Sequence, residues 1–248
     1  MKLLNNLIKA EFYRIKNSMF FNIIILVTFI LGITSSRSNV KFVDINGFGF
    51  FLELNATKPI DALHTAMGAT PILMIIIIML INNIVVDKYN GGITRQAISY
   101  GYNRRDIYIA SLIVINVCTV IITLILNFMC FILKVDISSL DLNTNIILIK
   151  EFILYIILIC TISSFYTFIC IVVKSKFLSA TIYVAFSIFF VTIFGELLMD
   201  NTTSLMLMNI ASNGISNVNV LKYILISIVV VLCSVLLGVD YFSKVDIF

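Results

Sequence analysis

The sequence predicts an all-α integral membrane protein with six transmembrane helices and an N-terminal amphipathic interfacial helix. Of its 248 residues, 60% are hydrophobic and only 12% are charged, a balance that excludes a soluble globular domain. The hydrophobic residues gather in long runs, and a helix needs roughly 20 such residues to cross a bilayer. In lipid the backbone must satisfy its own hydrogen bonds, so these runs favour helices.

Six runs of suitable length follow one another in a single transmembrane domain of residues 1–248. Charged residues or Asn, Ser and Gly bound each run. The predicted spans are residues 18–34, 66–86, 107–133, 152–173, 177–194 and 221–239. Because only residues 174–176 separate the fourth and fifth spans, these two are expected to form a tight hairpin.

Residues 1–17 form the predicted interfacial helix. Apolar residues recur there at three- and four-residue spacing, and basic residues lie opposite: Leu4, Leu7, Ile8, Phe12 and Ile15 against Lys9, Arg14 and Lys16. This pattern is typical of a helix lying along a membrane surface. Two roles are open, an anchor that orients the first span and a lever that contacts a cytoplasmic partner, and the sequence favours the anchor.

The distribution of Lys and Arg predicts the orientation, because cytoplasmic loops carry the excess of these residues. With the N-terminus inside, eleven lie on the cytoplasmic side: Lys2, Lys9, Arg14, Lys16, Lys88, Arg95, Arg104, Arg105, Lys174, Lys176 and Lys244. Six lie outside: Arg37, Lys41, Lys58, Lys134, Lys150 and Lys222. Both termini are therefore predicted in the cytoplasm. The absence of Trp and the many Ile, Asn, Lys, Phe and Tyr residues suggest a genome rich in A and T, which favours a bacterial source. The expected location is therefore a bacterial cell membrane.

No catalytic or metal-binding motif is visible. A phosphate-binding loop G-x-x-x-x-G-K-[ST] is absent, so this chain is not expected to hydrolyse ATP. The single histidine, His64, lies outside any H-E-x-x-H motif and is interpreted as an interfacial polar residue. The five cysteines lie in apolar runs, where thiols pack as small hydrophobes. We expect no enzyme activity, no metal and no cofactor in this chain, and the net charge of +4 predicts no nucleic-acid partner.

The spans contain almost no charge. Four charged residues fall at predicted span ends, where long side chains reach the interface: Lys150, Glu151, Glu196 and Lys222. Ion-coupled transporters need ionisable groups near the middle of the bilayer. The sequence therefore argues against coupling of this chain to a proton or sodium gradient.

The loop of residues 87–106 is the strongest functional candidate. Gly91 and Gly92 permit a sharp turn, after which Ile93, Ala97 and Ile98 fall near one helical face. A short amphipathic helix between two spans can sit in a groove of a partner protein. The alternative is an ordinary solvated loop whose positive charge only fixes the orientation.

This loop resembles the corresponding segment in permease subunits of ABC-2-type transporters. The likeness rests on an acidic residue leaving the second span, a Gly-containing turn, an apolar and basic stretch, a further Gly and two basic residues. It implies a coupling helix that docks on a separate ATPase subunit. The residues that it points to are Asp87, Gly91, Gly92, Ile93, Gly101, Arg104 and Arg105. At the position of Gly92, this family more often has the dipeptide Gly-Thr, so the chain departs from the family pattern there.

Two further segments are similar to such permeases, the lead-in of residues 10–18 and the tail of residues 238–246. In size and loop pattern the chain resembles the permeases of lantibiotic-immunity and antimicrobial-peptide export systems. The resemblance implies a second permease, either a copy of this chain or a paralogue, and an ABC ATPase that binds ATP and Mg²⁺. It also implies export of an amphipathic antimicrobial peptide or toxin.

Polar residues recur inside the spans. They form a stripe on the third span, a matching set on the fourth, and a pair near the end of the second: Asn116, Thr119, Thr123 and Asn127; Cys160, Ser164 and Thr167; Asn82 and Asn83. Such residues either hydrogen-bond helices to one another or line a pathway for substrate. The sequence favours helix packing, at about 1 kcal/mol for each bond.

Two other classes of function fit the same features. A membrane scaffold or sensor would use the 87–106 loop to hold a signalling partner. A facilitator channel would conduct in vesicles without any partner.

Overall fold

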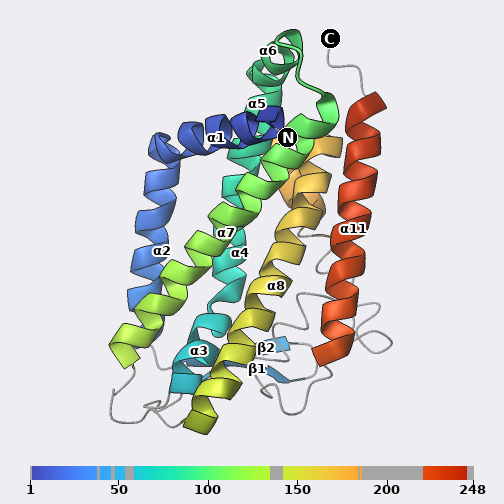
Figure 1. The fold of residues 1–248 in the computed structure, drawn as a ribbon. Coiled ribbons are helices and arrows are strands. Elements are labelled where there is room, and N and C mark those ends of the chain that lie inside the picture. Colours follow the sequence, from blue (N-terminus) through green and yellow to red (C-terminus); the bar gives the residue numbers. More distant parts are fainter. Residues whose placement is uncertain are drawn as a thin grey trace.

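The computed structural model describes residues 2–37, 40–45, 48–53, 59–134, 142–183, 185 and 220–244. Within them, long helices stand side by side in a bundle, and α1 (Lys2–Lys16) lies across one end (Figure 1). In the part of the chain that the structure describes, five helical segments are long and apolar enough to cross a membrane. The chain is therefore a multi-pass membrane protein. We call the two ends of the bundle the α1 end and the α3 end.

Four of the membrane-crossing segments are single helices: α2 (Met19–Arg37), α7 (Arg104–Lys134), α8 (Leu142–Val173) and α11 (Val220–Lys244). They overlap the predicted first, third, fourth and sixth spans. The helix α8 begins ten residues before the predicted fourth span. Its added first turns pack near α3 (Pro59–Gly68) at the α3 end.

The second span is segmented. The prediction of one helix over residues 66–86 is wrong at its start, because α3 ends at Gly68 and α4 (Thr70–Ile81) begins after Ala69. Pro71 lies in the first turn of α4, where a missing backbone N–H costs no hydrogen bond. A π-helix, η1 (Asn82–Val86), follows and leads into α5 (Asp87–Asn90). The apolar, membrane-crossing part is Ile72–Tyr89.

A β-hairpin departs from the all-α prediction. Strands β1 (Val40–Ile45) and β2 (Phe48–Glu53) pair antiparallel, with Val40 opposite Glu53 and Ile45 opposite Phe48. Both strands are rich in Val, Ile and Phe, which favour the pleated conformation. The dipeptide Asn-Gly at 46–47 separates them in the sequence, and this pair is the usual signal for a two-residue hairpin turn.

The turn between α8 and the next helix, residues 176–183, is as tight as expected. Lys174 adopts a positive φ of 56° there, and the rings of Tyr166 and Tyr183 meet edge to face at 5.0 Å across the hairpin. Apart from residue 185, the remainder of the predicted fifth span lies outside the described residues. α8 ends at the α1 end whereas α11 begins at the opposite end (Figure 1), an arrangement that the six-span prediction requires.

The helix α7 is the central packing element, since α1, α2, α3, α8 and α11 all contact it. Two glycines on its neighbours permit close approach. A Cβ at Gly32 of α2 would lie 2.6 Å from the Cβ of Met129. A Cβ at Gly238 of α11 would overlap the Tyr108 hydroxyl, which donates a hydrogen bond to the Ser234 carbonyl at 2.9 Å.

Replacement of Gly238 by Ala is expected to push α11 away from α7. Overpacking of this kind costs about 1 to 3 kcal/mol, so the thermal midpoint of Gly238→Ala in detergent should fall below that of the wild type. Leu237→Ala is the matched control, because the Leu237 side chain is exposed on the same helix. Equal midpoints for Gly238→Ala and the wild type would show that α11 does not dock here.

Candidate functional site at the α1 end

The two glycine turns around α6 (Ile93–Ser99) depend on glycine geometry. Gly92 has a φ of +72° and Gly101 a φ of +85°, a left-handed conformation that costs most other residues energy. Gly91 has a negative φ of −75°, yet a Cβ on it would lie 2.7 Å from the Asp87 carbonyl oxygen. Each predicted glycine therefore has a structural reason.

The helix α6 projects beyond α1 at the end of the bundle (Figure 1). Its Thr94 is buried, and Ala97 and Ile98 pack partly against the core. Tyr100, which follows α6, is 81% exposed, and Arg95 is also exposed. The helix therefore has one face on the protein and one exposed face, but the division differs from the prediction, because Ile93 is exposed and the buried residue is Thr94.

A buried ion pair joins α1 to the base of this projection. The carboxylate of Glu11 on α1 contacts the ammonium of Lys88 on α5, and the two side chains are 7% and 5% exposed. The Lys88 ammonium also donates a hydrogen bond to the Ser111 hydroxyl of α7 at 2.8 Å. Three elements that are far apart in the sequence therefore meet at one charged contact.

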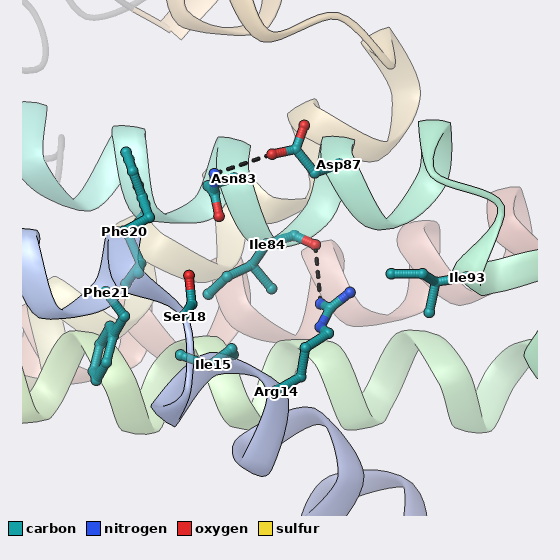
Figure 2. Close-up of a pocket in the computed structure, with 10 residues that line it drawn as sticks. Arg14, Ile15, Ser18, Phe20, Phe21, Asn83, Ile84, Asp87 and Ile93 are labelled. Atoms are coloured by element: carbon teal, nitrogen blue, oxygen red, sulfur yellow. Dashed lines mark hydrogen bonds between the residues drawn. The ribbon is translucent and has the colours of Figure 1, made fainter.

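Arg14 extends this cluster toward η1. Its guanidinium lies 2.8 Å from the Glu11 carboxylate and 3.4 Å from the Ile84 carbonyl oxygen (Figure 2). Two positive side chains thus share one buried carboxylate. The backbone that Arg14 reaches belongs to the π-helix, a type of turn that is rare and is often found at functional sites.

The helix of residues 176–183 is hydrogen-bonded to η1 and forms an ion pair with Asp87. Ser179 donates to the side-chain oxygen of Asn82 at 2.8 Å, and the Asn82 amide donates to the Lys176 carbonyl at 3.2 Å. Asp87 pairs with the Lys176 ammonium at 2.6 Å and accepts a hydrogen bond from Asn83 at 3.0 Å. Asn82 therefore joins η1 to this helix, whereas Asn83 bonds within its own segment and orients Asp87.

The predicted basic pair lies at the start of α7. Arg104 donates to the Ser243 carbonyl at 3.3 Å and so contacts the end of α11. Arg105 is exposed. Both line an open cavity of about 380 Å³ together with Asn103, Asp106 and Ser243. Ile93, by contrast, lines a different cavity, between α1, α2 and η1.

The polar stripe in the middle of the bundle makes hydrogen bonds between and within helices. Asn116 of α7 donates to Ser164 of α8 at 3.0 Å and accepts from Ser163. Three threonine hydroxyls donate hydrogen bonds to backbone carbonyls of their own helices: those of Thr119, Thr123 and Thr167. The Asn127 amide donates to the Thr123 carbonyl. Ser164 also donates to the Cys160 carbonyl. Among these bonds, those between Asn116 and the two serines join α7 to α8, whereas the others stay within one helix. Helix packing at the remaining positions therefore stays a prediction.

A second buried pair lies at the α3 end. The His64 imidazole and the Glu151 carboxylate are 2.9 Å apart, with side chains 8% and 1% exposed. The prediction that Glu151 reaches the interface is therefore wrong, because protein encloses its side chain. His64 lies before the apolar part of the second span, as predicted, but its side chain faces protein. α3 packs against α8, which covers both side chains. One turn further along, Thr70 and Tyr155 are within hydrogen-bond distance, at 3.2 Å.

Sequence reasoning did not select Glu11, Lys88 or His64 as site residues, but one signal was present. Glu11 lies on the same helical face as Leu7 and Ile15, which are both buried. An acidic residue on the apolar face of a basic surface helix requires a buried positive partner. Which residue supplies that charge depends on how the spans pack, and the sequence alone does not specify this.

The fold and this site define a polytopic α-helical membrane protein with a helix that projects from one end. Among the residues that the structure describes, no group of three or more His, Cys, Asp or Glu side chains is placed to hold a metal ion. In comparisons with known proteins, no protein-family model matches the sequence and no curated protein is significantly similar to it.

The buried pair gives a direct stability test. Glu11→Gln leaves the Lys88 ammonium buried without its carboxylate partner, which should cost about 3 to 5 kcal/mol. Lys88→Met should cost less, because Arg14 still pairs with the Glu11 carboxylate. The double variant should recover most of the Glu11→Gln loss, because the only charge left without its carboxylate is the partly exposed Arg14. Chemical or thermal unfolding in detergent measures all four proteins of this cycle.

The exposed pair of Lys244 and Asp240, 2.8 Å apart, provides the control. Lys244→Met should change stability little, since exposed ion pairs contribute only about 0 to 1 kcal/mol. Additive losses in the Glu11 and Lys88 variants would mean that the two side chains are not coupled.

Proposed function

We propose that this chain is the membrane-spanning permease subunit of an ABC exporter and that α5 and α6 form its docking element for a separate ATPase. The observation that carries the proposal is the projection of α6 from a base fixed by the buried Glu11–Lys88 pair. A docking element that transmits force needs one exposed face for the partner and a rigid attachment to the spans. This segment combines both properties.

The attachment supports force transmission because it reaches several spans. Lys88 contacts both α1 and α7, and Asp87 contacts the helix of residues 176–183 through Lys176. Displacement of α6 would act on these contacts together. In this proposal α1 serves as a lever as well as an anchor, and the partner ATPase supplies the bound ATP and Mg²⁺.

The surface of the bundle fits assembly within a membrane. The apolar faces of α2 and α11 are widely exposed, with side chains such as Ile23, Leu26, Leu225 and Leu236 between 48% and 67% accessible. A second permease, either another copy or a paralogue, and lipid would share these faces. An amphipathic antimicrobial peptide or toxin is the proposed cargo, because such a molecule can enter a bundle laterally from the bilayer.

A membrane scaffold or sensor remains the alternative, since a docking helix also serves a partner that does not hydrolyse ATP. The exporter and the scaffold or sensor differ in one measurable property, the presence of a bound ATPase. The exporter requires that the protein purified from its own host membranes carry Mg²⁺-dependent ATPase activity, whereas the same chain produced alone should have none.

Gly92 provides a sharp test of docking. Gly92→Val is expected to disrupt the turn before α6, because a β-branched side chain disfavours a φ of +72°. The variant should reach the membrane at normal levels yet lose at least about 90% of the co-purified ATPase activity, equivalent to roughly 1.4 kcal/mol of binding.

Gly92→Asn is the matched control, because Asn tolerates the left-handed conformation and should retain most of the activity. Full ATPase retention by a correctly inserted Gly92→Val protein would contradict the docking role.

The proposed topology places both termini in the cytoplasm of a bacterial cell. A cysteine introduced at Tyr100, in an otherwise cysteine-free protein, should then react with a membrane-impermeant maleimide only after the cells are opened. A cysteine at Asn46 should react in intact cells. The reverse labelling pattern would mean that the protein has the opposite orientation, with α6 outside the cell.

A further inference from the structure

A cavity of about 210 Å³ lies where α1, α2, η1 and α6 meet. Figure 2 shows the side chains around it. Its lining is apolar except for four polar residues: Arg14, Ser18, Asn83 and Asp87. Apolar walls with a few convergent polar groups are the usual form of a site for an organic ligand.

The polar groups of the lining include one cation, Arg14, and one anion, Asp87, whose carboxylate already pairs with the Lys176 ammonium at 2.6 Å. Arg14 and Lys88 share the single Glu11 carboxylate, so that cluster keeps one positive charge that an anionic ligand would balance.

Arg14 carries the positive charge, and its contacts with Glu11 and Ile84 both use one terminal nitrogen, Nη2. A guanidinium has five N–H donors in a planar fork that matches phosphate oxygens. Its side chain is 32% exposed, so the other donors are within reach of a ligand. The Ser18 hydroxyl, which makes no hydrogen bond to the residues that the structure describes, is a further donor.

The surroundings of the cavity indicate where such a ligand comes from. Its walls include Phe20 at the start of α2, and the same face of α2 continues through Ile23, Val27 and Ile30. These three side chains are 42% to 51% exposed. A row of apolar residues thus leads from the cavity along a membrane-crossing helix, and α1 lies at the level where lipid headgroups are expected.

We propose that this cavity binds the phosphate of a glycerophospholipid from the leaflet at the α1 end, with one acyl chain along Ile23, Val27 and Ile30. Arg14 and Ser18 donate to the phosphate. Phe20, Phe21 and Ile84 surround the glycerol region. Under the proposed topology this is the cytoplasmic leaflet. The site requires no ATPase, so it stands or fails separately from the export function.

Native mass spectrometry of the purified full chain tests this site with phosphatidylglycerol and phosphatidylethanolamine as probes. The wild type should retain one phospholipid under conditions that remove loosely held lipid. Arg14→Gln should weaken that retention about tenfold, as expected for loss of a charge-assisted hydrogen bond. Arg14→Lys should restore part of it. Lys9→Gln, which removes the same charge from an exposed position of α1, should leave retention unchanged.

A second variant tests the cavity without changing charge. Ser18→Phe fills the space and should also abolish the retained lipid, while the thermal midpoint of lipid-free protein confirms that it is folded. Equal retention in the wild type, Arg14→Gln and Ser18→Phe would overturn the proposal, as would equal losses in Arg14→Gln and Lys9→Gln. Displacement of the lipid by millimolar inorganic phosphate would identify a site for free anions and would also overturn it.

Discussion

Two opposite charges buried next to each other at the membrane surface constrain the architecture of the α1 end. Lys88 needs the Glu11 carboxylate, because an isolated charge with less than a tenth of its surface exposed is strongly disfavoured, and Glu11 is held by both Lys88 and Arg14. The pairing of Glu11 with Lys88 fixes the rotation of α1 about its own axis and the position of α5 relative to α1. The position of α6, the Arg14 contact with η1 and the walls of the cavity next to α2 all follow from that placement.

Apolar runs allowed much of the bundle to be predicted. Residues 107–133 and 221–239 lie within α7 and α11, since an uninterrupted run of this length has few alternatives in lipid. The same reasoning failed where a local signal competed with hydropathy. Pro71 starts a new helix inside the predicted second span, and the β-rich segments around the Asn-Gly dipeptide form a hairpin in a region interpreted as a loop.

The candidate site was predictable only in its backbone features. Gly92 could be selected because a positive φ belongs chiefly to glycine, whereas Gly101 was selected through the family resemblance. The π-helix before them left no sequence signal. The ion pairs were not predictable, because each joins residues whose proximity depends on how α1 meets α5, or α3 meets α8. Charges counted as orientation signals, such as Lys88, proved to be buried structural groups.

The π-helix η1 has a further consequence for the geometry of the second span. A π turn accommodates one more residue than an α turn, and one residue of an α-helix corresponds to about 100° of rotation and 1.5 Å of rise. If the wide turn migrated along the segment, each residue that it passed would rotate and advance by that step. The side chains of Asn82 and Ile84 would each contact different residues of the surrounding helices, while the helix stayed continuous. Such migration would change which residues of the second span face α8 and the helix of residues 176–183 without breaking the span.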